Sequence, residues 1–468
     1  MDDSSSPSER MSQPGQTGDA DLPMSLTANL AQLGLMAGSA IPPEARAVAQ
    51  LSLLDWLAVL HAGKDEAVSR ILQQQVLDEA APGQASLAAS SRQIPPRLAA
   101  LANGTTSHAL DYDDTHFGFV GHPSVAVFPA AMAIAEAQQA SLPAMLDAAL
   151  LGMEAACRIG MMLGSRHYNA GFHQTATAGC FGATVAAGRL LGLDLSGLTM
   201  ALGLVATRAS GLKSQFGTMG KPFNAGMAAS NGVEAALLAS RGFVAAADGV
   251  GCSQGFLDTH QAEQPVAAGL PVPPQGKMFF HAVTHKFHAC CHGTHAMLEA
   301  LQELISSHQL AAHDIAGITL VTNPRWLKVC DIAAPQSGLE IKFSYRHLAA
   351  MAAHGICTAA IENYDHDMAM RADLAAFRQR VRVVTDETLA DTAARLQLQT
   401  HAGVLLEAEH DLAVLPRLAE RQARVLAKAS TLLGEDRAAL LWQSVGSQQQ
   451  DSGIASLAPL AALIRARD

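Results

Sequence analysis

Apolar residues dominate the first half of the chain in long segments with helical spacing. Between about Pro42 and Ala262 these segments are apolar around most of their circumference, and most of them end near a glycine. A helix with so little polar surface needs neighbours on several sides. The pattern predicts a large helical body with helices at 42–63, 124–139, 145–164, 175–192, 198–211 and 224–243.

The hydrophobic period changes after residues 264–277, which hold four prolines and no regular pattern. Beyond them, β-branched or alternating runs predict strands, and helical segments lie between the strands. The predicted strands are 315–324, 380–387 and a hairpin over 394–410, and the predicted helices are 291–305 and 345–360. The pattern favours an α+β unit in this part of the chain.

From about Leu415 the spacing is helical again, so we expect the terminal helices to rejoin the first body. The predicted fold class is mainly α with an α+β insertion. We divide the chain into a helical domain at 23–277 and 411–468 and an α+β lid domain at 278–410. Residues 1–22 are acidic and rich in Ser, Pro and Gly, and they are expected to form a disordered tail.

Composition narrows the function classes. The 468 residues are 49% hydrophobic and 16% charged, which favours one large apolar body that self-associates. A net charge of −11 without a basic run argues against nucleic acid as a partner. The most apolar long window, from Pro143, carries three charges, so we expect no membrane span. Seven cysteines without a CxxC pair are typical of a reduced, cytoplasmic protein.

Six of the eight lysines lie between positions 213 and 342, in less than a third of the chain. A locally cationic region in an acidic protein suits a small anionic ligand. Chance clustering is the alternative. We include Lys286, from this group, among the candidate substrate-binding residues.

The stretch HALDYDDTHFGFVGHPS, residues 108–124, concentrates ionisable and hydroxyl side chains before an apolar helix. Aspartate and serine near a helix start can satisfy free N–H groups, and Ser124 is placed to cap the next helix. Capping needs one or two such residues, and this stretch has more of them. We therefore interpret it as part of a functional site formed from His108, Asp111, Asp113, Asp114, Thr115, His116 and His122.

Two more segments bring a basic side chain to the start of an apolar helix. His173 stands directly before the segment 175–192. A lone histidine is usually a satisfied core residue, but a helix N-terminus disfavours its protonated form and keeps it available as a base. Lys221 lies on a turn that enters the helix 224–243. A solvated surface lysine is the alternative, yet an ammonium group beside the N–H groups of a helix start attracts carboxylates.

Four histidines, at positions 285, 288, 292 and 295, recur at spacings of three, four and three. On one helix they would share a face, where Cys290 or Cys291 could complete a zinc site. No HExxH or CxxC motif accompanies them, and a turn at Cys290 would break the helix. We therefore predict no metal and a structural or substrate-facing role for these histidines.

Five segments in consistent order resemble the MmgE/PrpD family, which includes 2-methylcitrate dehydratase, cis-aconitate decarboxylase and iminodisuccinate epimerase. The segments are HALDYDDTH with HPS, GFHQTATAGCFGA, GTMGKPFNAGMAASNGVEAA, KFHACCHGTHA and IKFS. The resemblance runs from about Leu26 to the C-terminus. It implies a large all-helical domain of N- and C-terminal segments, an inserted α+β lid, a homodimer, and no metal or other cofactor.

Carried over motif by motif, the family's active-site positions fall on Asp111, Thr115, His122, His173 and Lys221. A family tyrosine three residues after the serine of the KFS-type motif is not matched. His347 occupies that place, and a tyrosine, Tyr345, stands two residues earlier.

The resemblance implies chemistry at a carbon next to a carboxylate. We expect Lys221 and His122 to hold substrate carboxylates and His173 to exchange the proton at carbon. Asp111 would orient a histidine, and Thr115 would bind a carboxylate or hydroxyl oxygen.

The predicted function is a lyase on a small di- or tricarboxylate, with a 2-methylcitrate dehydratase-like hydro-lyase as first choice. Dehydration needs a second acid, for which His347 or Tyr345 is the candidate. A cis-aconitate-type decarboxylase needs one proton donor, and an iminodisuccinate-type epimerase needs bases on both faces of the carbon, where His347 could serve as the second base. A metalloenzyme built on the histidines at 285–295 and a non-catalytic binding protein are the alternatives from other classes.

Overall fold

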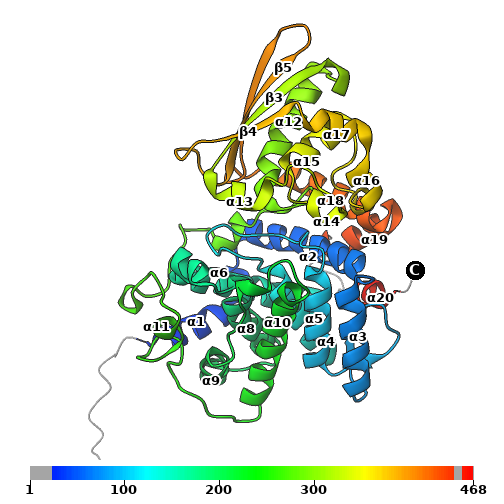
Figure 1. Ribbon diagram of the computed structural model, residues 1–468. Helices are drawn as coiled ribbons and strands as arrows, with labels where there is room; N and C mark the ends of the chain where they lie inside the picture. The colour runs from blue at the N-terminus through cyan, green and yellow to red at the C-terminus, as the bar shows by residue number, and fades with distance from the viewer. Residues whose placement is uncertain (1–23, 447–455, 467–468) are drawn as a thin grey trace, which may run out of the picture.

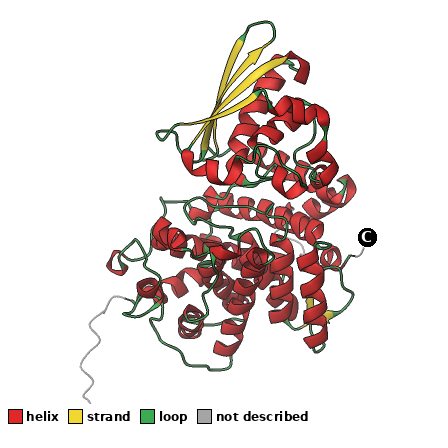
Figure 2. Cartoon of the chain, viewed as in Figure 1, coloured by secondary structure: helices red, strands yellow, loops and turns green. Residues whose placement is uncertain are grey.

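The computed structural model describes residues 24–446 and 456–466, and in this part the chain forms two lobes (Figure 1). The lower lobe is a helical body, and the upper lobe, called the lid below, contains the four-stranded sheet (Figure 2). The two lobes have separate hydrophobic cores. The tail predicted at residues 1–22 lies outside the described residues.

The helical body is built around helices that are apolar on all sides. Its first helices are α1 (Leu26–Gly34), α2 (Pro43–Gly63), α3 (Ala67–Glu79), α4 (Pro96–His108), α5 (Ser124–Ala137), α6 (Leu142–Ala170), α7 (Gln174–Thr177), α8 (Gly179–Leu190), α9 (Leu195–Ala206), α10 (Gly220–Ala239) and α11 (Phe256–Thr259). In α5, every residue from Ser124 to Ala135 is buried. Such a helix is stable only with neighbours on every side, as the sequence pattern predicted.

Small residues let these helices approach closely. A Cβ atom on Gly152 of α6 would lie 2.5 Å from the carbonyl oxygen of Gly182 in α8, and the converse distance is also 2.5 Å. Any side chain at either position would push the two helices apart. The abundant glycine and alanine therefore permit the dense packing around α5, α8 and α10.

The C-terminal helices return to the helical body, which confirms the predicted insertion. They are α18 (Leu418–Leu433), α19 (Glu435–Gly446) and α20 (Ala458–Arg465). Val425 and Ala429 of α18 belong to the same core as α2 and α6. The Lys428 ammonium lies 2.6 Å from a carboxylate oxygen of Asp55 on α2, and both side chains are buried.

The lid is a mixed sheet with helices on one face (Figure 2). Its strands are β3 (Ile315–Thr322), β4 (Val381–Thr385), β5 (Ala393–Thr400) and β6 (Leu405–Asp411), in the order β4-β3-β5-β6. Strand β3 is parallel to β4 and antiparallel to β5. Alternate residues of β5, Leu396 and Leu398, are buried against helices, as the period of two requires. The helices are α12 (His295–His308), α13 (Leu327–Cys330), α14 (Gly338–Ile341), α15 (Tyr345–Ala353), α16 (His366–Met370) and α17 (Ala372–Arg378).

The main elements of both lobes match the predicted ones, and the fold class is confirmed. Several boundaries differ. The segment 175–192 divides into α7 and α8, and the segment 345–360 is helical only to Ala353, because Gly355 then takes a left-handed φ of 69°. The helix predicted at 291–305 starts at His295 after a short 3₁₀ turn. A small pair of strands, β1 (Ala85–Ser86) and β2 (Gln93–Ile94), had no recognisable signal in the sequence.

The segment that leads into the lid packs first on the helical body. Met278, Phe280 and Val283 are buried in the core of the body, although they follow the predicted boundary. The division at 277/278 and 410/411 remains our proposal. Among the described helices, none combines the length and apolar character needed to cross a membrane.

Candidate functional site

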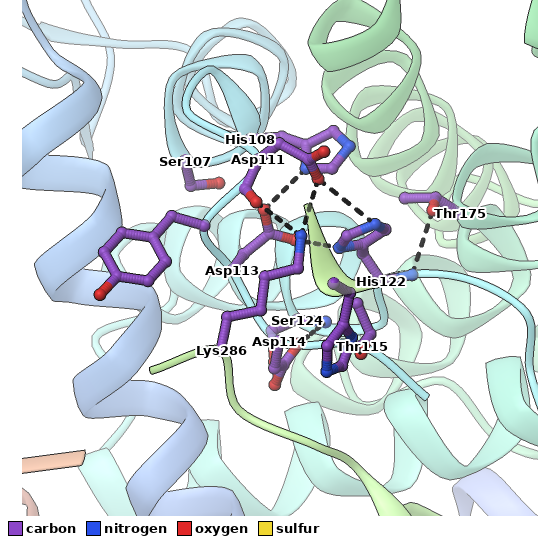
Figure 3. Close-up of polar contacts among 12 residues, drawn as sticks. Ser107, His108, Asp111, Asp113, Asp114, Thr115, His122, Ser124, Thr175 and Lys286 are labelled. Atoms are coloured by element: carbon purple, nitrogen blue, oxygen red, sulfur yellow. Dashed lines mark hydrogen bonds and ion pairs between the residues drawn. The ribbon is translucent and has the colours of Figure 1, made fainter. Parts of the chain in front are cut away.

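The loop that follows α4 is fixed at both ends. At its start, Asp111 adopts a left-handed backbone with φ of 53°. In its middle, Thr115 and Thr284 exchange backbone hydrogen bonds of 2.9 and 2.7 Å. At its end, the backbone N–H of His122 donates to Thr175 Oγ1 of α7 at 3.1 Å (Figure 3). Pairing with Thr284 also carries the neighbouring Lys286 to the loop.

Asp111 lies between two lysines. Its carboxylate oxygens lie 2.8 Å from Lys221 Nζ and 3.0 Å from Lys286 Nζ, and Lys286 also donates to the Asp111 carbonyl at 2.6 Å (Figure 3 shows the Lys286 contacts). Burial alone raises the pKa of Asp111, but the two ammonium groups outweigh it and hold the pKa well below its ordinary value. The Asp111 side chain is 33% exposed and that of Lys286 only 2%, so the group opens outward on the Asp111 side.

Asp113 lies between two imidazoles. One carboxylate oxygen lies 2.8 Å from His108 Nδ1 and the other lies 2.8 Å from His122 Nδ1. The Asp113 and His108 side chains are fully buried, and the His122 side chain is 12% exposed. Burial alone raises the pKa of Asp113, but the two histidines outweigh it and hold the pKa well below normal. Burial also lowers the pKa of His122 to about 4, so this imidazole is neutral near pH 7. A neutral His122 does not hold a carboxylate by charge, which argues against that part of its expected role.

His173 is the residue before α7 and lies beside the same group. Its backbone N–H donates to the Gly211 carbonyl at 3.0 Å, and Asn224 Nδ2 lies 3.3 Å from its Nδ1. Its ring lies parallel to that of His108 with centroids 6.0 Å apart. Burial, followed by nearby positive charge, lowers the pKa of His173 well below its ordinary value. The neutral imidazole expected from the sequence is therefore present, although burial is the main cause and α7 is only four residues long.

Lys221 lies in the first turn of α10, which starts four residues earlier than the predicted helix, and its ammonium group lies 5.2 Å from the centre of the Phe216 ring. The edge of the same ring packs on His173 at 5.0 Å. Phe216 is 37% exposed, so it covers the outer side of both residues.

Sequence reasoning missed Phe216, Asn224 and the pairing of Asp113 with two histidines. The alternating aspartates of DYDD were the available signal for the last of these.

Thr115 contacts the lid rather than the lysines. Its hydroxyl lies 2.7 Å from His292 Nδ1, and the His292 ring packs on Phe117 at 5.2 Å. The expected role of Thr115 in binding substrate oxygen stays a prediction. The contact does place His292 at the edge of the candidate site.

Two residues of the stretch 108–124 have structural partners instead. Asp114 accepts hydrogen bonds from the Ser124 hydroxyl at 2.5 Å and the Ser124 backbone N–H at 3.4 Å. Ser124 is thus the first residue of α5 and not its cap, and Asp114 satisfies the helix start. Burial raises the pKa of Asp114 to about 7. His116 lies 2.8 Å from the Phe279 carbonyl and accepts from the Phe119 N–H at 2.9 Å.

The structure does not bring Tyr345 and His347 to this group. Ser344 caps α15 by accepting from the backbone N–H of His347 at 3.2 Å, which turns both side chains into the lid core. The Tyr345 hydroxyl donates to the Gly293 carbonyl at 2.8 Å, and His347 Nδ1 lies 3.3 Å from Arg378 of α17. Both residues are buried. The expectation that one of them supplies a second acid or base finds no support in this arrangement.

The histidines at 285–295 do not share one helix face. His285 lies in the helical body between Ser52 and Arg421, at 3.0 Å from each. His292 belongs to the 3₁₀ turn and His295 begins α12. The turn at the cysteines, which was the alternative considered, is what forms.

Another group of four side chains brings possible metal-ligand atoms close together. Ligand atoms of His108, Asp111, Asp113 and His122 lie within 4.8 Å of one another. However, the Asp111 carboxylate already contacts two ammonium groups, which repel a divalent cation. The residues therefore fit a metal poorly, and the combination of ammonium groups with neutral imidazoles suits an organic anion and proton transfer.

Comparison with known proteins identifies the family. Residues 36–268 match the MmgE/PrpD N-terminal domain, and residues 288–438 match the MmgE/PrpD C-terminal domain. The chain belongs to the MmgE/PrpD family.

The curated relatives of this MmgE/PrpD chain include several cis-aconitate decarboxylases. The chain is 31% identical over 309 residues to the cis-aconitate decarboxylase of Aspergillus terreus, which covers 62% of each chain. It is 30% identical over 281 residues to a cis-aconitate decarboxylase-like protein of Aspergillus oryzae, covering 57% of this chain and 58% of the relative. The match to the human cis-aconitate decarboxylase is 33% over 159 residues, or 32% of each chain. These matches span less than two thirds of the relatives' length.

Of the positions carried over from the MmgE/PrpD family, four lie together: Asp111, His122, His173 and Lys221. Lys286, expected from the lysine-rich region, joins them. Their catalytic roles stay predictions, as do the homodimer and the cytoplasmic location.

Proposed function

We propose that this MmgE/PrpD chain is a lyase on a small di- or tricarboxylate, and that decarboxylation is its reaction. The observation that carries the proposal is the pairing of two ammonium groups with neutral imidazoles around Asp111. Ammonium groups bind carboxylates and stabilise negative charge that develops beside them. Neutral imidazoles accept and return protons near pH 7.

In the proposed reaction, Lys221 and Lys286 bind one carboxylate of the substrate next to the reacting carbon. Loss of carbon dioxide leaves the bonding electron pair on the carbon skeleton, and an imidazole delivers one proton to carbon. The imidazole is neutral in the free protein and takes this proton from solvent when the substrate carboxylates bind beside it, so the reaction consumes one proton and releases one carbon dioxide. His173 is the proposed donor because it is buried beside Lys221 and the site.

The sequence alone favoured dehydration, but two observations now favour decarboxylation. Dehydration requires an acid for the leaving hydroxyl group, and both candidates, Tyr345 and His347, have their hydrogen-bond partners inside the lid. The relatives matched over the longest segments are named cis-aconitate decarboxylases. Epimerisation is the third possibility, and it would use His122 and His173 as two bases.

The test is a product analysis in deuterated water. Purified protein is incubated separately with cis-aconitate, 2-methylcitrate, citrate and iminodisuccinate, and the products are followed by NMR. The proposal expects carbon dioxide loss from a tricarboxylate, with one deuterium incorporated at carbon. Alkene formation from a hydroxy acid would indicate dehydration, exchange with inversion would indicate epimerisation, and no turnover of any substrate would contradict the lyase proposal.

His173→Ala tests the proposed proton donor. We expect kcat to fall about 10²–10⁴-fold, the usual contribution of a positioned acid or base. His313→Ala is the matched control because the His313 side chain is 85% exposed. A His173→Ala protein with wild-type turnover would refute the assignment.

We also propose that no metal is required, so prolonged chelation should leave the rate unchanged.

A further inference from the structure

Asp113 differs from the other carboxylates of the stretch in what it contacts. One of its oxygens shares a hydrogen bond of 2.8 Å with His108 Nδ1, and the other lies 2.8 Å from His122 Nδ1 at ion-pair distance but without hydrogen-bond geometry. The Asp113 side chain has no exposed surface. Asp114, the next residue, is equally buried but binds the start of α5. Asp113 therefore serves the imidazoles rather than a helix end.

We propose that Asp113 is a positioning residue that keeps a proton on Nδ1 of both His108 and His122, so that Nε2 of each ring accepts protons. The role rests on the proposed function, because it matters only where an imidazole transfers protons. An ionised carboxylate has no hydrogen to donate, so the hydrogen bond between His108 and Asp113 requires the hydrogen on Nδ1. At His122, a lone pair on Nδ1 would face the other Asp113 oxygen at 2.8 Å and be repelled by it, which favours a hydrogen on this nitrogen as well. A neutral imidazole has a single N–H, which leaves Nε2 as the acceptor.

The Nε2 atoms of His122 and His108 have different surroundings and therefore different roles. His122 Nε2 lies 3.6 Å from an Asp111 oxygen, on the side where the two lysines lie and where the site opens. Asp113 stabilises a proton taken up there, whereas burial and the nearby Lys286 oppose it and favour the neutral ring. His108 Nε2 is buried without a hydrogen-bond partner among the described residues.

The His108 ring also packs on both other imidazoles of the site. Its centroid lies 4.6 Å from that of His122 and 6.0 Å from that of His173. The His108 side chain is fully buried. The contact with Asp113 fixes the position of the His108 ring, and the rings of His122 and His173 pack against it.

The first experiment reads the tautomers directly and does not depend on turnover. Histidine labelled with ¹⁵N is incorporated into the full chain, and the His122 signals are assigned by difference with His122→Phe. The proposal expects a protonated Nδ1 and an unprotonated Nε2 for His122 at pH 7. A proton on Nε2 of His122 in the wild-type protein would overturn the proposal, even if no substrate is ever found.

The second experiment uses Asp113→Asn, with Asp114→Asn as the matched neighbour. An amide offers a donor as well as an acceptor, so Asp113→Asn should give a mixture of tautomers at His122. We expect kcat to fall about 10²–10⁴-fold with KM nearly unchanged, and Asp113→Glu to recover part of the loss. Asp114→Asn should lower stability and leave the His122 tautomer unchanged.

Wild-type kcat in Asp113→Asn, or an unchanged His122 tautomer, would contradict the positioning role. If Asp113→Asn does not fold, the tautomer of the wild-type protein still decides the question. If the protein turns over none of the carboxylates, the proposed function fails while the tautomer measurement remains valid.

Discussion

The described residues include two groups of buried histidines near the loop 109–123, and the groups differ in their partners. In both groups the ring centroids lie about as close, 4.6 and 6.0 Å in one and 4.8 and 5.0 Å in the other. We call them the body histidines (His108, His122 and His173) and the lid histidines (His288, His292 and His295). Ring proximity alone does not distinguish a reactive group from a structural one.

The partners do distinguish them. Two of the body histidines, His108 and His122, contact Asp113, and the group lies beside Asp111 with its two lysines, at the side that is open. In the lid group, His288 lies 2.6 Å from the Thr358 hydroxyl and 3.3 Å from Glu299, which also pairs with Arg424 of α18. Through Glu299, His288 thus joins the lid to a helix of the body, whereas His292 lies at the edge of the candidate site beside Thr115. Two lysines paired with Asp111 lie beside the body histidines, and the pair of Glu299 with Arg424 lies beside His288.

Among the four predictions that test this comparison of the two groups, the largest effect is expected at Lys221. Lys221→Ala should lower kcat/KM about 10²–10³-fold or more, because it removes a fixed charge from the carboxylate-binding side of the body histidines. The measurement is turnover of whichever carboxylate the product analysis identifies. Lys277→Ala is the matched control, since Lys277 is an exposed lysine of the same region. Equal rates in the two variants would remove the distinction between the groups.

The fold was largely predictable because its signals are local. Apolar segments with glycine ends predicted most of the long helices but not α3 or α4, and alternation predicted all four lid strands. The grouping of Asp111 with Lys221 and Lys286 was only partly predictable, because these residues are brought together by the loop's pairing with Thr284 and by the start of α10. The residues next to each candidate in the sequence were enough to identify it as a candidate. No sequence pattern, however, predicts which carboxylate lies beside which basic side chain.

The histidine spacing at 285–295 shows the opposite failure. A regular spacing of three and four suggested one helix face, yet His285 lies between Arg421 and Ser52, away from the others. Likewise, the position of His347 relative to a motif suggested an active-site residue, but capping by Ser344 and the contact with Arg378 fix it in the lid core. Tertiary partners decided both cases.

The second prediction concerns the ion pair beside the lid histidines. Glu299→Gln should lower the free energy of unfolding by about 1–3 kcal/mol, because Arg424 and His288 lose a buried charged partner. Burial raises the pKa of Glu299, but His288 and Arg424 outweigh it and lower the pKa to about 2. Denaturant unfolding measures the loss, and Glu303→Gln, an exposed position on the same helix, is the control.

Catalytic turnover of the folded Glu299→Gln protein should stay within a few-fold of wild type. A loss as large as that of Lys221→Ala, with stability unchanged, would assign the lid histidines to the chemistry and reverse the comparison.

The third prediction is a pH dependence shared by both lobes. Burial lowers the pKa of His122, in the body, and of His347, in the lid, to about 4 in each case. Unfolded histidines titrate near 6.5, so between about pH 6.5 and 4 the unfolded chain binds more protons than the folded chain. Stability should therefore fall as the pH is lowered through this window, by about 1.4 kcal/mol per pH unit for each such histidine.

Denaturant unfolding between pH 7 and 5 measures this slope. Replacing His122 by Gln should reduce the slope by about one proton, whereas replacing the exposed His313 by Gln should leave it unchanged. Equal slopes in wild-type and His122→Gln proteins would mean that His122 titrates normally in the folded chain, and that its neutrality does not set the body histidines apart.

The smallest effect is expected from His347→Tyr, which places the family's tyrosine at the position where this chain has histidine. If position 347 belongs to the lid core, as its contacts with Ser344 and Arg378 indicate, kcat and KM should both stay within about twofold of wild type. Steady-state kinetics on the identified carboxylate, with Tyr345→Phe measured in parallel, provides the test. Because both side chains are buried, either variant should change stability more than rate.

A tenfold rise in kcat, or a change of product, in His347→Tyr alone would mean that this side of the lid reaches the reacting carbon during turnover. The acid for dehydration would then be supplied from the lid, and the division between a reactive body and a structural lid would no longer hold.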